Sequence, residues 1–244
     1  MGIRHKLIRF IEQPSGIKDL ISGVRPIHTY YFHNVKKFTD SIKTYIDIGA
    51  NQGKLIEACR LVFPESYVYA IEPIKKHYHS LEKFSNITIF NCGLWNENTT
   101  KTFYHTKKDD YESSLLKPTM LDDNDIGTDI EELTIPVRRF DTLSIDIKSP
   151  CFVKLDVEGA EANVLEGMGD KLDEVDFVQL EQIHVKKNEH ENIMSRCVKI
   201  LEDHGFTGFI QIGTTYYPNG LPSKSDLLFF KEDMSNKPWF KKDG

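Results

Sequence analysis

From residue 43 onward, short runs of β-branched and aromatic residues alternate with longer stretches in which apolar residues recur at helical spacing. This alternation is typical of βαβ units, which place parallel strands in one sheet and cover both of its faces with helices. We therefore expect an α/β fold with a doubly wound, mostly parallel, seven-stranded sheet. The expected strands are Thr44–Ile48, Tyr67–Ile71, Ile87–Asn91, Cys151–Leu155, Val175–Leu180, Phe206–Ile212 and Asp226–Phe230. The expected helices include Lys54–Val62, Lys75–Phe84, Ala160–Gly167 and Glu189–His204.

The length of 244 residues suits one domain. We expect residues 1–40 to form an N-terminal helical extension and residues 41–244 to form the domain, with an insert at about residues 93–149. Two more strands are expected in the insert, at Lys101–His105 and Leu133–Arg139. The acidic stretch Asp122–Glu132 is expected to be a solvated loop, because it lacks the ligand spacing of a calcium loop. Ligands bind at the carboxyl ends of strands in open sheets, so the insert is expected to act as a lid or acceptor wall.

Composition limits the partners of the chain. With 31 Lys and Arg against 37 Asp and Glu, the formal net charge is -6, which disfavours nucleic acid as a partner. No apolar stretch approaches the roughly 18 residues that a membrane-spanning helix needs. Four widely spaced cysteines and the lack of a signal-peptide core favour reduced thiols and a cytoplasmic location.

The first twelve residues form an expected amphipathic helix, with Ile3, Leu7, Ile8 and Ile11 on one stripe and basic residues largely elsewhere. Such a helix is suited to peripheral contact with an anionic membrane surface. The same stripe is also suited to packing on its own domain or on a second copy in a homo-oligomer. The sequence leaves these alternatives open.

The segment from Tyr45 to Lys54 runs from an apolar strand through a turn with two glycines directly into a helix. Gly49 and Gly53 permit left-handed backbone dihedrals and the close approach of a ligand, while the helix start presents unpaired N–H groups. A dinucleotide fingerprint would need glycines where this sequence has Asn51 and Lys54. A diphosphate ligand is therefore disfavoured at this turn.

The pattern D-x-G-x-N-x-G, which begins at Asp47, resembles motif I of the class I S-adenosylmethionine-dependent methyltransferases. That ligand carries a sulfonium and an ammonium and no phosphate, so a carboxylate at the sheet edge favours it and would oppose a diphosphate. The resemblance implies a Rossmann-like class I methyltransferase fold. It also implies cofactor contacts from Asp47, Gly49, Ala50, Asn51 and Gly53.

Glu72 ends the next apolar run, Val68 to Ile71. An acid at the end of the second strand can accept hydrogen bonds from both ribose hydroxyls of an adenosine ligand. Enzymes that bind NAD share this requirement, so Glu72 alone does not choose between the two cofactors. An ordinary exposed Glu before a turn Pro is the alternative interpretation.

A longer resemblance follows downstream. The run Lys154-Leu155-Asp156-Val157-Glu158-Gly159-Ala160-Glu161, followed by Val164-Leu165-Glu166-Gly167, is similar to the signature of the FkbM family of methyltransferases. This resemblance, over roughly residues 43–231, implies methyl transfer from S-adenosylmethionine, usually to a hydroxyl of a sugar, polyketide or related metabolite. Cys92 and Gly93 follow the third strand, where related enzymes line the adenine pocket, although a buried thiol and a turn glycine explain them equally.

Three residues are candidates for the chemistry, because methyl transfer needs a group that orients the acceptor and takes its proton. Asp156 and Glu158 lie at the carboxyl end of a buried strand, where Asp156 would also contact the cofactor; Glu158 is alternatively a stabilising charge at a helix N-terminus. His184 ends the fifth strand and titrates near neutral pH, as a general base should. These three residues together with Glu181 could alternatively surround a hard cation such as Mg²⁺.

We therefore expect an S-adenosylmethionine-dependent O-methyltransferase that acts on a small-molecule or glycan acceptor. Asp156-Val157-Glu158-Gly159 stands where methyltransferases of nucleobase amino groups carry an Asn/Asp-Pro-Pro-aromatic sequence, which argues against that chemistry. Three rivals remain: a nicotinamide-dependent oxidoreductase, a non-catalytic protein that binds an adenosyl ligand, and a nucleic-acid methyltransferase with a local basic face.

Overall fold

Seven strands form the main sheet of the computed structural model, which describes residues 26–107, 113–117, 130–184, 194–231, 236–238 and 240. They are β1 (Thr44–Ile48), β2 (Tyr67–Ile71), β3 (Ile87–Phe90), β7 (Cys151–Leu155), β8 (Phe177–Ile183), β9 (Gly208–Tyr216) and β10 (Pro222–Phe230). Their order across the sheet is β3-β2-β1-β7-β8-β10-β9. β10 runs antiparallel to both of its neighbours, β8 and β9, and every other pair in this sheet is parallel. The predicted doubly wound, mostly parallel sheet is confirmed.

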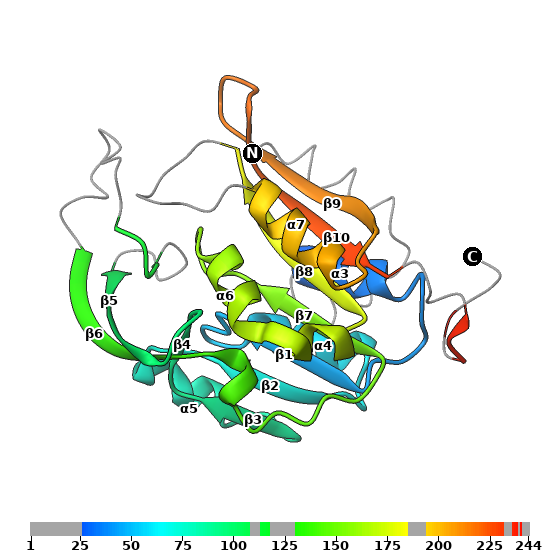
Figure 1. Cartoon of the computed structure of the whole chain (residues 1–244), viewed down its shortest axis with the longest axis horizontal. Coiled ribbons are helices and arrows are strands. Elements are labelled where there is room, and N and C mark those ends of the chain that lie inside the picture. The colour runs from blue at the N-terminus through cyan, green and yellow to red at the C-terminus, as the bar shows by residue number, and fades with distance from the viewer. Residues whose placement is uncertain are drawn as a thin grey trace.

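Helices cover both faces of this sheet, as Figure 1 shows. On one face α6 (Glu161–Met168) and α7 (Met194–Asp203) pack against inward-facing residues such as Ile46 and Val153. On the other face lie α3 (Pro26–Val35) and α4 (Lys54–Val62). Phe32 of α3 makes edge-to-face ring contacts with Tyr45 and Phe152, at centroid distances of 5.1 and 5.7 Å. The helix that precedes the first strand is therefore part of the core.

The insert forms a second, three-stranded sheet in the order β4-β6-β5, at the left of Figure 1. Its strands are β4 (Gly93–Leu94), β5 (Thr99–Thr106) and β6 (Ile130–Arg138). Both predicted insert strands are present, and β6 begins early enough to include Glu131 and Glu132, which the sequence placed in a loop. The described residues also include four short helical segments: η1 (Lys75–His77), α5 (Tyr78–Leu81), η4 (Phe140–Thr142) and η5 (Gly169–Glu174).

Some expectations fall outside the described residues. These are the amphipathic helix at residues 1–12, the acidic residues 122–129, and the beginning of the helix expected from Glu189. All four cysteines are described, and each is a buried free thiol. Over the ranges given above, no helix combines the length and the apolar character required to cross a membrane.

Candidate functional site

A cavity of about 280 Å³ opens at the carboxyl ends of β1, β2 and β7. This volume is close to the lower limit of ordinary small-molecule sites, and the position is the usual one for ligands of open α/β sheets. The predicted cofactor residues that line the cavity are Gly49, Ala50, Asn51, Glu72, Cys92, Gly93 and Asp156. Residues from separate parts of the chain, which the sequence analysis assigned one at a time, thus share one cavity.

The turn after β1 gives the cavity its floor. Gly49 has φ 84° and its N–H donates to the Ile71 carbonyl over 3.0 Å. A Cβ at Gly49 would lie 2.1 Å from the backbone oxygen of Asp156, so only glycine fits between β1 and β7 here. Gly53 has φ 80° and precedes α4, where a Cβ would lie 2.6 Å from the Phe84 ring. Gly53 is thus required by packing behind the turn, and it does not line the cavity.

Glu72 is buried at the wall of the cavity, with 4% exposure. Its Oε2 accepts the Asn51 backbone N–H over 2.7 Å, and its Oε1 accepts the Ile74 backbone N–H over 2.8 Å. His77 Nδ1 lies 3.4 Å from the same Oε1. The alternative interpretation of Glu72 as an exposed turn residue is wrong. The carboxylate joins the β1 turn to the segment after β2, and each of its oxygens keeps a second lone pair.

The cavity wall contains a buried lysine, Lys154, that was not among the residues predicted from the sequence. Lys154 of β7 is 4% exposed, pairs in register with Asp47 of β1, and its Nζ donates to Asp156 Oδ2 over 2.7 Å. A charged residue inside an otherwise apolar buried strand is rare without an ionic partner, and this was the signal available in the sequence. Although burial lowers the pKa of Lys154, the carboxylates of Asp156 and Asp47 more than offset that effect. Lys154 is therefore protonated.

Asp47 is 1% exposed and lies just before the Gly49 turn. Neither of its carboxylate oxygens has a hydrogen-bond partner of good geometry among the residues that the structure describes, although the Tyr45 hydroxyl lies close enough to stabilise its charge. Burial raises the pKa of Asp47 to about 6, although Lys154 opposes this shift. Among the described residues Asp47 is not part of the cavity lining, so it can act on a ligand there only through its charge and not by direct contact.

Asp156 lies on the other side of the turn, and its side chain is 39% exposed. Burial would raise its pKa, but the ammonium groups of Lys154 and Lys224 bring the pKa below its usual value. Asp156 is thus an ionised carboxylate that faces the cavity, with one oxygen held by Lys154. This geometry suits a group that accepts a hydrogen bond or a proton from a bound molecule.

A second charged cluster continues from Asp156. One carboxylate oxygen each of Asp156, Glu158 and Glu181 lie within 4.8 Å of one another. Lys224 of β10 occupies this cluster: its Nζ is 2.9 and 3.0 Å from the two oxygens of Glu158 and 2.7 Å from Glu181 Oε2. Burial raises the pKa of Glu158 to about 8 and that of Glu181 to about 7. Sequence reasoning had no local signal for Lys224, which lies far from both glutamates in the chain.

His184 does not join this cluster. Side chains alternate between the two faces of a sheet along each strand. Ser225 pairs with Gln182, so these two side chains lie on one face, whereas Glu181 and Lys224 lie on the other. By the same alternation His184 lies on the face of Ser225. His184 is exposed, and its Nε2 lies 2.8 Å from Ser225 Oγ. Within the described part of the chain it is not among the residues that line the cavity. Its assignment as the general base stays a prediction that this geometry does not favour.

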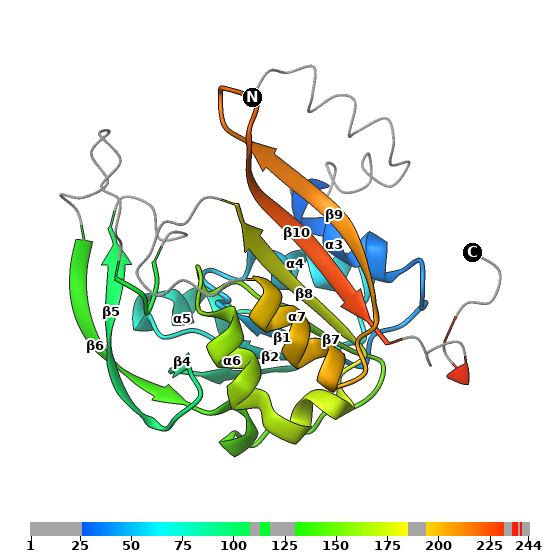
Figure 2. The same cartoon turned by 45° about the horizontal axis from the view of Figure 1, so that its top comes forward.

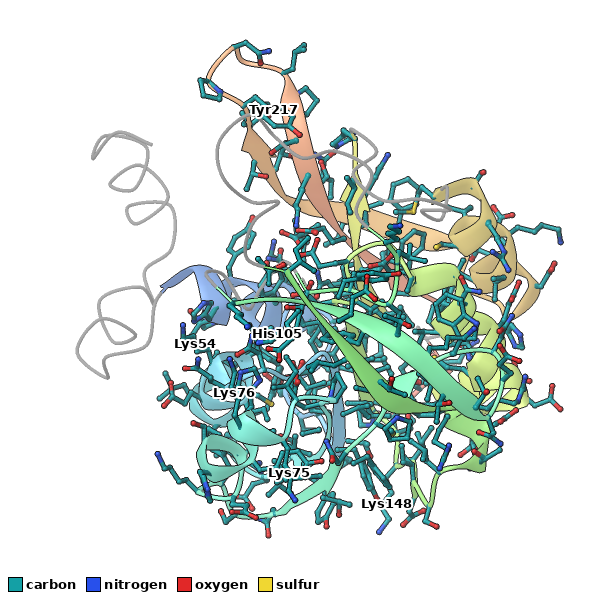
Figure 3. The ribbon with its side chains drawn as sticks, turned by 90° about the vertical axis from the view of Figure 1, so that its left-hand side faces the viewer. Lys54, Lys75, Lys76, His105, Lys148 and Tyr217 are labelled. Atoms are coloured by element: carbon teal, nitrogen blue, oxygen red, sulfur yellow. The ribbon has the colours of Figure 1, made fainter. Side chains whose placement is uncertain are left out.

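Two further elements close the cavity. From α3, His28 and Tyr31 reach its lining, and the Tyr31 hydroxyl donates to Asp226 Oδ2 over 3.1 Å. From the insert come Phe103, Ser113 and Leu115. Figure 3 shows His105 of β5 beside Lys54 and Lys76, and His105 Nε2 is 3.3 Å from Lys76 Nζ. The insert is therefore a wall of the cavity, as its place in the sequence predicted.

Comparison with known proteins places this site in a family. Residues 47–207 match the model of the methyltransferase FkbM domain. A search of curated proteins gave no match. Among solved structures, the chain is similar to precorrin-6y C5,15-methyltransferase from Geobacter metallireducens, with 13% identity, a TM-score of 0.42, and coverage of 83% of this chain and 86% of that one.

Two other solved structures show a comparable level of similarity to this chain. The plantazolicin methyltransferase BpumL in complex with SAH is 11% identical, with a TM-score of 0.42 and coverage of 94% of this chain and 90% of that one. An rRNA methylase from Streptococcus thermophilus is 11% identical, with a TM-score of 0.45 and coverage of 85% and 97%. The assignment rests on the family model, which spans more than half of the sequence and includes the turn, Glu72 and the Asp156 segment. The chain belongs to the methyltransferase FkbM family.

Proposed function

We propose that the chain binds S-adenosylmethionine in this cavity and methylates a hydroxyl oxygen of a small-molecule or glycan acceptor. The observation that carries the proposal is the position of β1 between β2 and β7, which places Glu72 and Asp156 on either side of the Gly49 turn. Family membership supports methyl transfer. The net charge of -6 supports an acceptor other than nucleic acid.

The residues present fit this cofactor. Glu72 offers carboxylate oxygens to vicinal ribose hydroxyls, and Ile48, Ile71 and Leu94 supply apolar contacts for a purine ring. The Asp47 carboxylate, buried behind the cavity wall beside Lys154, favours a cationic ligand through its charge. The carboxylates of Asp47 and Asp156 beside the Gly49 turn would repel the diphosphate of a nicotinamide cofactor, so the oxidoreductase alternative is disfavoured. When bound, S-adenosylmethionine supplies an electrophilic methyl group on a positively charged sulfur.

The acceptor side of the reaction is assigned to Asp156. One of its oxygens accepts a hydrogen bond from Lys154, and this bond fixes the carboxylate at the cavity wall. Its other oxygen then accepts the hydrogen bond of the acceptor hydroxyl and orients the oxygen lone pair toward the methyl group. As the oxygen gains its methyl group, the hydroxyl proton passes to Asp156.

The expected divalent cation does not fit the carboxylate cluster as it stands. Asp156, Glu158 and Glu181 would offer oxygen ligands, but the Lys224 ammonium already contacts both glutamates. A Mg²⁺ ion would have to displace this ammonium against strong charge repulsion. The proposed reaction therefore includes no step at a metal, and Glu158 and Glu181 hold Lys224 in place.

Isothermal titration with S-adenosylmethionine, S-adenosylhomocysteine and NAD tests the proposal. We expect micromolar or tighter binding of the first two and no binding of NAD. Glu72→Ala should weaken binding by about 1–3 kcal/mol, through lost hydrogen bonds to the ribose and a loosened Asn51 turn. Glu82→Ala, with a 61% exposed side chain, is the control and should bind like the wild type.

A second measurement separates an enzyme from a non-catalytic binding protein. Incubation with S-adenosylmethionine and a panel of hydroxylated acceptors should release S-adenosylhomocysteine. Binding without any such release would support the non-catalytic alternative. Equal affinity of the wild type and Glu72→Ala would remove the ribose assignment.

A further inference from the structure

Three polar side chains join the segment after β2 to the insert at the edge of the cavity. Lys76 of η1 approaches His105 of β5, with 3.3 Å between Lys76 Nζ and His105 Nε2. The other ring nitrogen of His105, Nδ1, lies 3.2 Å from Oγ of Ser113, and Ser113 lines the cavity. Figure 3 shows His105 beside Lys76, and Figures 1 and 2 place the insert sheet on the side of the domain where α5 follows η1. A line of polar contacts thus runs from the exposed Lys76 to the cavity.

The Lys76 ammonium decides which nitrogen of His105 carries a proton. An ammonium group has three donors and no acceptor, so Nε2 accepts the hydrogen bond from Lys76 and carries no proton. A neutral imidazole keeps one proton, which is therefore on Nδ1. His105 is 5% exposed, so protein groups and not bulk water surround its ring. His105 Nδ1 then donates to Ser113 Oγ.

The Ser113 hydroxyl is left with a proton to donate. A hydroxyl group has one proton and two lone pairs on its oxygen. The backbone N–H of Thr106 donates to one lone pair over 3.1 Å, and His105 Nδ1 donates to the other over 3.2 Å. With both lone pairs occupied, the hydroxyl proton has no acceptor among the residues that the structure describes. Because Ser113 lines the cavity, a bound molecule can supply that acceptor.

The insert residues that line the cavity with Ser113 lie at the end that we assign to adenosine. Leu115 lies against the chain after β3, since a Cβ at Gly93 would be 3.4 Å from Leu115 Cδ1. Phe103 and Leu115 pack with Ile74 in one apolar cluster. Ile74 follows the carboxylate assigned to the ribose by two positions, and its N–H donates to that carboxylate. The Ser113 hydroxyl is therefore on the base and ribose side of the cavity.

We propose that the Ser113 hydroxyl donates a hydrogen bond to the adenosine part of the cofactor, and that Lys76 directs this donor through His105. The inference rests on the proposed function and adds a cofactor contact from the insert. The atom that accepts is a ring nitrogen of the base or a hydroxyl oxygen of the ribose, because both carry lone pairs. Ser113 is thus a binding residue, while His105 and Lys76 are positioning residues that act through it.

Calorimetric titration of S-adenosylhomocysteine into Ser113→Ala tests the contact. We expect the Kd to rise about fivefold, the usual loss for one uncharged hydrogen bond. The 1-deaza, 3-deaza and 7-deaza analogues and the 2′-deoxy and 3′-deoxy analogues each lack one candidate acceptor atom. With one of these analogues the wild type and Ser113→Ala should bind equally, which identifies the accepting atom. An equal loss with every analogue, or no loss with S-adenosylhomocysteine itself, would contradict the contact.

Lys76→Met tests the positioning role, and Lys75→Met is the matched control, because both lysines are exposed residues of η1. Without the Lys76 ammonium, the His105 ring can hold its proton on Nε2, and Ser113 then donates to Nδ1 instead of the ligand. We expect the Kd of S-adenosylhomocysteine to rise a few-fold in Lys76→Met and to stay unchanged in Lys75→Met. Adding Lys76→Met to Ser113→Ala should cause no further loss, because both changes remove the same contact.

The ¹⁵N NMR spectrum of the His105 ring reports the tautomer without any ligand. At pH 8 we expect the Nδ1–H tautomer in the wild type and in Lys75→Met, and a population of the Nε2–H tautomer in Lys76→Met. The Nε2–H tautomer or a doubly protonated ring in the wild type would overturn the proposal, as would an unchanged tautomer in Lys76→Met. Failure of the wild type to bind S-adenosylhomocysteine would contradict the proposed function itself. Normal binding that Ser113→Ala leaves unchanged would contradict only the role of Ser113.

Discussion

Asp47 and Lys154 are a pair of opposite charges at the cavity wall. Both side chains are almost completely buried, on neighbouring strands and on the same face of the sheet. Lys154 gives a hydrogen bond to Asp156 and gives none to Asp47. The charge of Asp47 is thus only partly compensated before a ligand binds, and we infer that a cationic ligand completes the compensation.

The pH dependence of cofactor binding should report Asp47. Burial raises its pKa to about 6, so Asp47 is mostly neutral at pH 5 and mostly ionised at pH 7. A cation prefers the ionised form, so affinity for S-adenosylmethionine should increase by up to about tenfold from pH 5 to pH 7. Calorimetric titration across this range measures the effect. Asp47→Asn should bind weakly with a flat profile, and a profile like that of the wild type would contradict the assignment.

Lys154 should affect turnover more than cofactor affinity, because its hydrogen bond orients Asp156. Lys154→Met leaves Asp156 without this partner, and we expect kcat to fall by about a hundredfold with a few-fold change in the Kd of S-adenosylhomocysteine. Lys154→Arg keeps the charge and a donor and should recover part of the rate. If both variants lose cofactor affinity and thermal stability in parallel, with no separate loss of kcat, Lys154 is structural only.

At the scale of elements, the strands of the main sheet were predictable because their apolar runs are short and clearly separated. β1, β2 and β7 have the expected bounds, and β3 is one residue shorter. β8 and β9 begin two residues later than expected and continue beyond the expected apolar runs, and β10 begins earlier, at Pro222. Pairing with a neighbouring strand extends all three through polar residues. The helix expected over Lys75–Phe84 became η1 followed by the single turn of α5.

The sequence predicted those residues of the candidate site that belong to local motifs, and it did not predict the others. The β1 turn, Glu72 and Asp156 follow directly from strand ends, and the structure brings them together. Tyr31 and Lys224 had no such signal, because each enters the site through a contact with a residue far away in the chain. His184 was predicted correctly to lie at the end of a strand. However, the alternation of side chains along β8 places it on the sheet face opposite Glu181, away from the cavity.

The turn between β1 and α4 tests this element directly. Gly49→Ala would force a Cβ against the Asp156 backbone oxygen, so we expect a loss of about 3 kcal/mol in stability and loss of S-adenosylhomocysteine binding. Gly205→Ala is the matched control, because Gly205 has a similar φ of 83° and an added methyl group there would meet nothing within 4 Å. Chemical denaturation and calorimetry measure both. Equal effects in the two variants would show that backbone strain, and not the contact with β7, requires Gly49.

At the scale of the whole molecule, two sheets and one helix enclose the site. The main sheet supplies the floor through β1, β2 and β7, while the insert and α3 supply opposite walls. The main sheet also carries Lys224 of β10, whose ammonium is bound to Glu158 in the loop after β7. One architecture thus positions the cavity and the Asp156 carboxylate along a single edge of the main sheet.

A crystal structure of the chain with S-adenosylhomocysteine tests the central claim most directly. We predict density for the whole ligand in the cavity, with both ribose hydroxyls on Glu72 and the sulfur on the side of Asp156. An empty cavity at saturating ligand, or a ligand bound away from the Gly49 turn, would contradict the account.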